Sequence, residues 1–136
     1  MSRRMIKAGI EVHGYRNNVQ KAEEQYEKGY ISGYTTSLES LVQVVHSNTG
    51  VFDDTSKVPG VFMMVVPAET VEDTLNELLQ FCVEGDIIID HGNSNFKDSR
   101  RRAERLSKLG IQYIDCGTSG GVYLSLIHIS EPTRPY

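Results

Sequence analysis

The chain has 136 residues with 14 basic and 18 acidic side chains, which gives a net charge of −4. This length fits one domain of common size and is short for an enzyme with separate cofactor and substrate domains. The 39% hydrophobic content excludes a disordered chain, and the negative charge disfavours nucleic acid as a partner despite the basic cluster at residues 100–102.

The apolar runs and the cysteines give no sign of a membrane segment or of secretion. The longest apolar run, VFMMVV at residues 61–66, is too short to cross a bilayer, and the first residues contain no hydrophobic signal region. Cys82 and Cys116 lie far apart without the spacing of a zinc site, which predicts buried reduced thiols. The sequence predicts a soluble, cytoplasmic chain with no metal site.

The first third of the chain predicts three helices and one strand. Met1, Met5 and Ala8 have helical spacing before Gly9, and alternating apolar residues then indicate a strand over residues 10–14. Two amphipathic helices follow, the first over residues 17–29 and the second after Ser37, its expected N-cap. The residues expected to face inward on these two helices are Val19, Ala22, Tyr26, Leu38, Leu41, Val42 and Val45.

The rest of the chain alternates strand and helix after a polar loop at residues 46–60. Strands are expected at residues 61–67, 87–90 and 111–117, and helices at residues 69–82 and 97–110. The residues expected to face inward on these helices are Val71, Leu75, Leu78, Leu79, Cys82, Ala103, Leu106 and Leu109. Continuous apolar strands alternating with helices predict a doubly wound parallel α/β sheet with helices on both faces.

Small and polar residues follow each predicted strand, where ligands bind in open α/β sheets. These segments are residues 15–18, 66–69, 90–95 and 117–121. Asn93 offers an acceptor and two donors, which suits a carboxamide and a sugar hydroxyl, but a Gly-Asn pair is also typical of a simple turn. The same alternative holds for Gly120-Gly121, whose backbone a ligand could approach closely.

Two further groups of polar residues favour ordinary structural roles. Lys97, Arg101, Arg105 and Lys108 share one helical face, which we interpret as the solvated side of an amphipathic helix. An acid/base role for His91 is disfavoured because no third orienting group or nucleophile accompanies it.

Residues 85–122 resemble the coenzyme domain of decarboxylating 6-phosphogluconate dehydrogenases. The family shows a strand ending in DGGNS, a basic helix and a strand ending in SGG, matched here by DHGNSN, KDSRRR and GTSGG. VFMMVVPAETVEDTLNELL and EVHGY fit the preceding elements, so the resemblance covers residues 1–123. It implies a Rossmann-like fold and oxidative decarboxylation of 6-phosphogluconate to ribulose 5-phosphate with NAD or NADP. A homo-oligomer is also implied.

The resemblance carries over site residues position by position. Coenzyme-binding positions are Arg16, Asn17, Asn18, Val66, Pro67, Ala68 and Asn93. Substrate-binding positions are Asn93, Ser119, Gly120 and Gly121. Since Arg16 stands where NAD enzymes commonly place an acidic residue, we expect NADP as the coenzyme.

The chain also departs from the family pattern. His91 replaces a usual glycine, and residues 48–60 form an insertion. The family's first strand, its GxGxxG turn and its catalytic Lys and Glu have no counterpart here, so no position is assigned a catalytic role. We therefore expect a truncated domain that is inactive and marginally stable alone, in which the strand near residue 10 and those from residue 61 onward lack a shared neighbour.

The last residues differ in character from the rest. LSLIHISEPTR, residues 124–134, resembles a translated transposase adapter of sequencing libraries. We expect residues 1–123 to be a partial NAD(P)-binding domain and residues 124–136 to be a non-native tail, with a divergent natural terminus as the alternative. For the function, the alternatives are a noncatalytic nucleotide-binding module and another β-hydroxyacid dehydrogenase.

Overall fold

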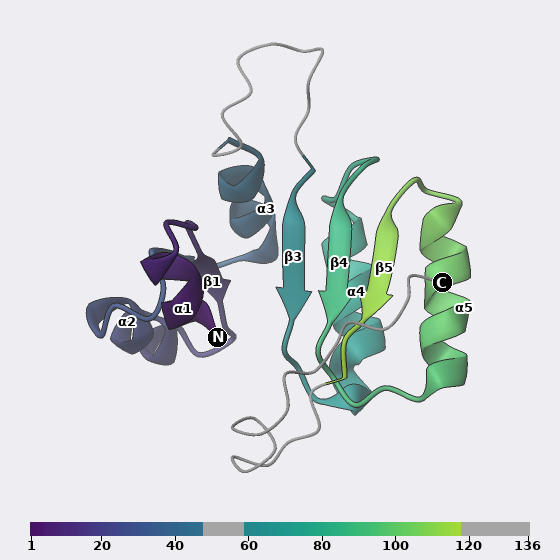
Figure 1. Ribbon diagram of the computed structural model, residues 1–136, viewed down its shortest axis with the longest axis horizontal. Helices are drawn as coiled ribbons and strands as arrows, with labels where there is room; N and C mark the ends of the chain where they lie inside the picture. The colour runs from purple at the N-terminus through teal and green to yellow at the C-terminus, as the bar shows by residue number, and fades with distance from the viewer. Residues whose placement is uncertain (48–58, 118–136) are drawn as a thin grey trace. The chain divides into compact units, whose positions relative to one another are not determined.

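A computed structural model describes residues 1–47 and 59–117 of the chain (Figure 1). The chain divides into two compact units, Met1–Lys57 and Val58–Tyr136. Each unit contains its own parallel sheet, so the predicted α/β class is confirmed. As expected, the strand that follows residue 10 and the strand that begins at residue 61 belong to different sheets.

The first unit consists of five short elements. They are α1 (Ser2–Lys7), β1 (His13–Tyr15), α2 (Val19–Glu27), β2 (Gly33–Thr35) and α3 (Leu38–Ser47). Strands β1 and β2 pair in parallel, and both α2 and α3 pack on this strand pair. The sequence analysis missed β2 because its three residues, GYT, are too few to show a periodic pattern.

The apolar core of the first unit is small. Ala22, Ile31 and Val42 are its buried apolar residues. The predicted inward face of α2 is wrong for two of its three residues, since Val19 is 39% and Tyr26 is 48% exposed. A two-stranded sheet offers too little surface to cover a whole helix face, which explains the difference.

Two capping interactions fix helix starts in this unit. The Ser37 hydroxyl accepts a hydrogen bond from the Ser40 amide at 3.1 Å, which confirms Ser37 as the cap of α3. The Asn18 side chain accepts one from the Lys21 amide at 3.2 Å and begins α2. Both caps satisfy amides that lack a partner in the first turn of a helix.

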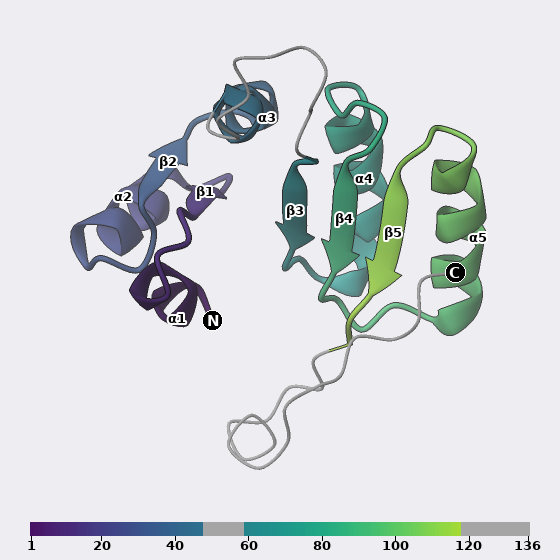
Figure 2. The same ribbon diagram turned by 45° about the horizontal axis from the view of Figure 1, so that its top comes forward.

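The second unit holds three strands and their connecting helices. The elements are β3 (Val61–Met64), η1 (Ala68–Thr70), α4 (Val71–Leu79), β4 (Ile87–Asp90), α5 (Phe96–Ser107) and β5 (Gln112–Asp115). The strands pair in parallel in the order β3-β4-β5 (Figure 2). All three strands lie where the sequence predicts them.

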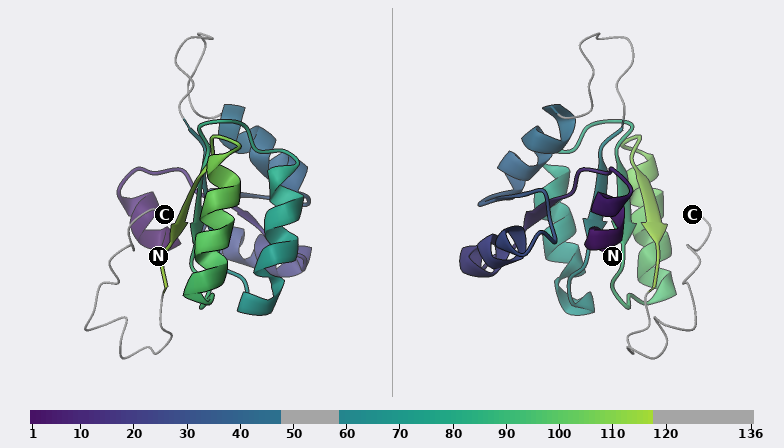
Figure 3. Two further views of the ribbon diagram at one scale, coloured as in Figure 1. Left: turned by 90° about the vertical axis from the view of Figure 1, so that its right-hand side faces the viewer. Right: turned by 60° about the vertical axis from the view of Figure 1, so that its left-hand side comes forward.

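Helices α4 and α5 lie on the same face of this sheet (Figure 3, left). Successive crossovers in one direction along a parallel sheet are right-handed and therefore place their helices on one side. The sequence predicts helices on both faces of the sheet, whereas in this unit the two helices cover a single face. The strand residues turned toward the helices are buried, as Phe62, Ile88 and Tyr113 show.

The second unit has the larger core. Its fully or almost fully buried apolar residues are Phe62, Met64, Val71, Leu75, Leu78, Ile88, Ala103, Leu106, Ile111, Tyr113 and Cys116. Leu109 is 54% exposed, so its predicted inward position is wrong. It lies beyond the last residue of α5, next to Gly110, whose φ of +74° ends the helical course of the backbone.

Cys82 and Cys116 are both free thiols, as predicted, with Cys116 buried and Cys82 half-buried. Among the described residues, no helix is long and apolar enough to cross a membrane. Most of the predicted insertion and the whole predicted tail at residues 124–136 lie outside the described residues.

Candidate functional site

The carboxyl ends of the three strands of the second unit are level with one another. Met64, Asp90 and Asp115 are paired across the sheet. The next residues continue the ladder, because the His91 amide donates to the Met64 carbonyl at 2.9 Å and the Cys116 amide donates to the Asp90 carbonyl at 2.8 Å. The segments that leave these strands therefore begin at one common edge, where ligands bind in open α/β sheets.

Two of the segments predicted to bind the coenzyme meet at this edge. A Cβ on Gly92 would lie 3.2 Å from the carbonyl oxygen of Val66 and 3.4 Å from Cγ2 of Val71. The turn after β4 thus packs closely against the start of the segment after β3. The structure brings Val66, Pro67 and Ala68 into the same region as the turn that carries Asn93.

The segment after β3 is held by a short 3-10 turn. Pro67 precedes η1, and its carbonyl accepts hydrogen bonds from the Thr70 amide and the Thr70 hydroxyl, each at 2.9 Å. Val65 is 70% exposed, and Pro67 and Ala68 are exposed as well. Apolar side chains that are exposed on a conformationally fixed segment are available for contact with a ligand.

The carboxylate of Asp90, which is fully buried, holds the turn after β4. Its Oδ1 accepts from the Gly92 amide at 2.8 Å, and its Oδ2 accepts from the Ser94 hydroxyl at 2.9 Å. Asn93 lies between these two anchored residues and is itself exposed. The turn therefore has a fixed backbone and an outward-facing amide side chain.

Asp90 is in turn contacted from the neighbouring strand. The hydroxyl of Tyr113 on β5 donates to Asp90 Oδ2 at 2.5 Å. Burial raises the pKa of Tyr113, and the hydrogen bond to Asp90 acts in the same direction. Tyr113 therefore remains a protonated donor at neutral pH.

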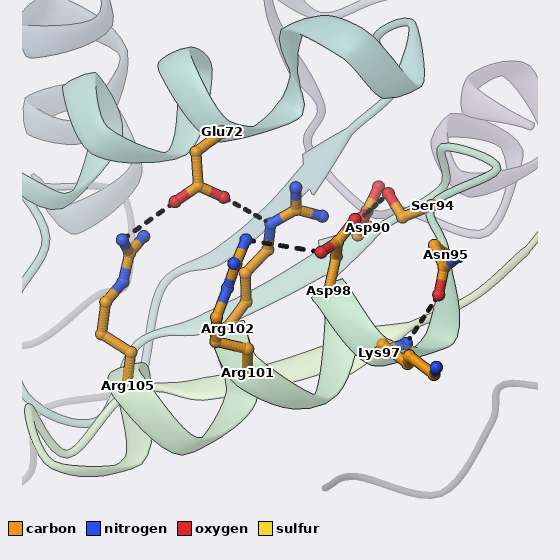
Figure 4. A network of polar contacts seen from close by, with 9 residues as sticks. All are labelled: Glu72, Asp90, Ser94, Asn95, Lys97, Asp98, Arg101, Arg102 and Arg105. Atoms are coloured by element: carbon orange, nitrogen blue, oxygen red, sulfur yellow. Dashed lines mark hydrogen bonds and ion pairs between the residues drawn. The ribbon is translucent and has the colours of Figure 1, made fainter.

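A second polar cluster joins the two helices of this unit (Figure 4). Glu72 on α4 accepts from Arg102 Nε at 2.7 Å and from Arg105 Nη1 at 2.9 Å, both on α5. The hydrogen bond from Arg102 lowers the pKa of Glu72. Arg102 is buried, and this role was not predicted because the sequence shows Arg102 only as one member of the basic cluster at residues 100–102. Arg102 lies one helical turn from Ser99 and from Leu106, on the buried face of α5, and this spacing could have indicated that Arg102 is buried.

The other basic residues of α5 fit the solvated face that the sequence predicts. Lys97, Arg101 and Lys108 are exposed, and Arg101 forms an ion pair with Asp98 at 3.4 Å. Arg105 is also exposed, although it binds Glu72. The helix begins at Asn95, whose side chain accepts from the Lys97 amide at 2.9 Å.

His91 is buried beside this edge, and its burial lowers its pKa. The prediction that His91 does not perform acid/base chemistry stays a prediction. Among the described residues, no group of three or more His, Cys, Asp or Glu side chains could hold a metal ion.

The remaining predicted coenzyme residues follow β1 in the first unit. Arg16, Asn17 and Asn18 are all exposed. Asn17 accepts a hydrogen bond from the Tyr15 hydroxyl at 3.2 Å, and Asn18 is the cap of α2. Arg16 thus extends from a short turn in which both following side chains are engaged. The predicted substrate residues Ser119, Gly120 and Gly121 lie outside the described residues.

The residues at the β3-β4-β5 edge fit a nicotinamide dinucleotide. The glycine at position 92 leaves no room for a side chain, since a Cβ would also lie 3.0 Å from Asp90 Oδ1. Beside it stand the exposed apolar surface of residues 65–68 and the amide of Asn93. Exposed apolar side chains next to an amide that donates and accepts are groups that could contact a ring bearing a carboxamide.

Comparison with known proteins connects the chain with one group of dehydrogenases. Residues 1–126 match the family model described as the NAD binding domain of 6-phosphogluconate dehydrogenase. A putative 6-phosphogluconate dehydrogenase of Bacillus subtilis is 30% identical over 122 residues, which cover 90% of this chain and 37% of that protein. The decarboxylating 6-phosphogluconate dehydrogenase of Candida albicans is 42% identical over 76 residues, which cover 56% of this chain and 15% of that protein.

Solved structures show the same fold at low identity. The 6-phosphogluconate dehydrogenase of Plasmodium falciparum matches with a TM-score of 0.69 and 20% identity, over 91% of this chain and 25% of that chain. A 3-hydroxyisobutyrate dehydrogenase of Salmonella typhimurium matches with a TM-score of 0.65 and 19% identity, over 90% of this chain and 39% of that chain. This chain spans well under half the length of each of these four proteins.

Proposed function

We propose that this chain, which belongs to the family of NAD-binding domains of 6-phosphogluconate dehydrogenase, is the coenzyme-binding part of such an enzyme. The whole enzyme would oxidise 6-phosphogluconate and release CO2 to give ribulose 5-phosphate. The observation that carries the proposal is the edge formed by residues 65–68 and the anchored turn that carries Asn93. We further propose that the intact protein is a cytoplasmic homo-oligomer, in keeping with its reduced cysteines.

Different residues would contact different parts of the coenzyme and the substrate. Val66, Pro67 and Ala68 would support the nicotinamide end by apolar contact, and Asn93 would bind both coenzyme and substrate through its amide. Ser119, Gly120 and Gly121 would bind the substrate. When bound, the coenzyme accepts a hydride from the sugar acid. The described residues contribute orientation, because the turn after β4 is fixed before any ligand arrives.

Arg16 supports NADP as the coenzyme. A basic residue after this strand can bind the 2′-phosphate, whereas an acidic residue would repel it. Arg16 is exposed, and the adjacent Asn17 and Asn18 are held by Tyr15 and by the first turn of α2. In the complete open reading frame, Arg16→Asp should reverse the preference toward NAD, and a retained NADP preference would contradict this proposal.

The activity test uses the complete open reading frame that contains this chain. NADPH formation at 340 nm with 6-phosphogluconate, together with CO2 release, is the expected result. Asn93→Ala should lower kcat/KM by at least about tenfold because Asn93 contacts both ligands. Lys108→Ala, an exposed change at the C-cap of α5, is the matched control and should leave the rate unchanged.

A second candidate function is oxidation of another β-hydroxyacid. The fold likeness to 3-hydroxyisobutyrate dehydrogenase, at a TM-score of 0.65, favours it. Parallel assays of the complete protein with 3-hydroxyisobutyrate and with 6-phosphogluconate distinguish the two candidate functions. Turnover of 3-hydroxyisobutyrate alone would favour the second candidate over the proposed function. Coenzyme binding without turnover of either acid would favour a noncatalytic nucleotide-binding module.

A further inference from the structure

The turn that carries Asn93 is anchored on both sides of that residue by one buried side chain, that of Asp90. Three donors converge on its two carboxylate oxygens, with Gly92 N on Oδ1 and both Ser94 Oγ and Tyr113 OH on Oδ2. Two of these donors flank Asn93 in the sequence, one on either side. The position of Asn93 is therefore set by the position of the Asp90 carboxylate.

Tyr113 sets the position of that carboxylate in turn. It lies on β5, in the register position next to Ile88, and its side chain is 98% buried. A tyrosine ring in a packed core has few rotamers, so its hydroxyl is a fixed point within the sheet. A contact of 2.5 Å to a carboxylate is a short, charge-assisted hydrogen bond, about twice as strong as a neutral one.

The turn has little freedom to move by other routes. A side chain at position 92 would meet the Val66 carbonyl and the Val71 side chain, and the His91 amide donates to the Met64 carbonyl. Asn95 is committed as the cap of α5. The anchored residues on both sides leave Asn93 as the exposed member of the turn, with its side chain directed by its neighbours.

We propose that Asp90 and Tyr113 are positioning residues, which act through the turn at residues 91–95 to hold Asn93 ready for its ligand. The inference rests on the proposed function of Asn93 as a coenzyme-binding residue. An ordinary turn-stabilising role would leave ligand affinity unchanged when the anchor is removed, whereas a positioning role lowers affinity even in a chain that stays folded.

Tyr113→Phe is the decisive variant because it removes one hydroxyl and leaves the packed ring in place. Ser94→Ala removes the second anchor independently. Ser99→Ala is the matched control, since Ser99 is a fully buried hydroxyl in the same unit with no hydrogen-bond partner among the described residues. Asn93→Ala tests the proposed function itself.

The measurements use the complete open reading frame that contains this chain, with NADP+ as the probe. NMR follows the amide exchange of Gly92 and the order parameter of the Asn93 side-chain amide, and a titration gives the Kd for NADP+. Tyr113→Phe and Ser94→Ala should each raise Gly92 exchange and the Kd by about five- to tenfold, with Asn93 more mobile. Exchange at Ile88 reports any loss of stability of the whole unit in each variant. Ser99→Ala should change neither Kd nor order parameter.

The outcomes separate the two proposals. If Asn93→Ala weakens binding of NADP+ while Tyr113→Phe and Ser94→Ala leave the Kd unchanged, the positioning role is overturned and the proposed function stands. If Asn93→Ala leaves the Kd unchanged, or if the complete wild-type protein does not bind NADP+, both proposals are overturned. A loss of affinity in Ser99→Ala equal to that in Ser94→Ala would also overturn the positioning role, because it would show a general effect of loosened packing.

Discussion

Replacement of Asp86 by alanine should destabilise the second unit strongly. Asp86 is 1% exposed and lies just before β4, at the edge opposite the candidate site. Its Oδ1 accepts from the Gly60 amide at 3.0 Å, and its Oδ2 accepts from the Val83 amide at 2.9 Å. One carboxylate thus joins the residue before β3 to the turn after α4.

The magnitude follows from the exposure of the two amides. A buried donor left without a partner costs about 1–3 kcal/mol. Gly60 is buried, so its amide would lose its acceptor without replacement, whereas Val83 is 46% exposed and its amide can bind water. We expect a loss of about 2–3 kcal/mol for Asp86→Ala, most of it from the Gly60 amide. Asp86→Asn should also destabilise the unit, because its amide group would face a donor.

Native-state hydrogen exchange at the Ile88 amide is the appropriate assay because Ile88 lies in the central strand and reports on this unit alone. The expected loss corresponds to exchange that is roughly 30- to 150-fold faster. Asp73→Ala on the exposed first turn of α4 is the control, with an expected loss below about 1 kcal/mol. An increase in exchange of less than about fivefold for Asp86→Ala would refute the reasoning.

Three further predictions concern single side chains. Burial raises the pKa of Cys82 to about 12, so iodoacetamide at pH 8 should label it at least about 100-fold more slowly in the folded chain than in urea. Because the hydrogen bond from Arg102 lowers the pKa of Glu72 below 4.5, its stabilising effect is present above pH 4.5 and is lost as the pH falls through the folded-state pKa. Acid unfolding of Glu72→Gln should accordingly show a shallower pH dependence below 4.5, and an unchanged slope would contradict this. Gly110→Ala should lower the unfolding free energy by about 1–2 kcal/mol, measured by urea denaturation, because φ is +74° and the new Cβ would lie 2.4 Å from Cγ of Glu84.

Strands β3 and β4 of the second unit could be located from the sequence because each is built on a continuous apolar run. Residues 61–64 and 87–89 are apolar on both faces. A strand that is buried within a parallel sheet needs such a run, so the pattern and the structure share one cause. In the first unit, β2 has three residues and includes Gly33, and no periodicity can be read from so short a segment.

The segments that form the candidate site could be predicted from the sequence, but the buried polar residues that hold them could not. Val66 and Asn93 follow predicted strands, and the topology of a parallel sheet brings such segments to one edge. The supports Asp90, Tyr113 and Arg102 could not be recognised in this way. Each is polar at a position that periodicity assigns to the core, and only the fold shows which groups satisfy it.

The two units therefore differ in how well they prepare a coenzyme site. In the second unit, Asp90 and Tyr113 fix the turn beneath Asn93 before any ligand binds. In the first unit, the turn after β1 is held by the Tyr15 hydroxyl and a single helix cap, above a core of three small or medium side chains. Since each side chain that becomes ordered on binding opposes affinity, the contacts of the exposed Arg16 side chain should contribute less net affinity than their charge suggests.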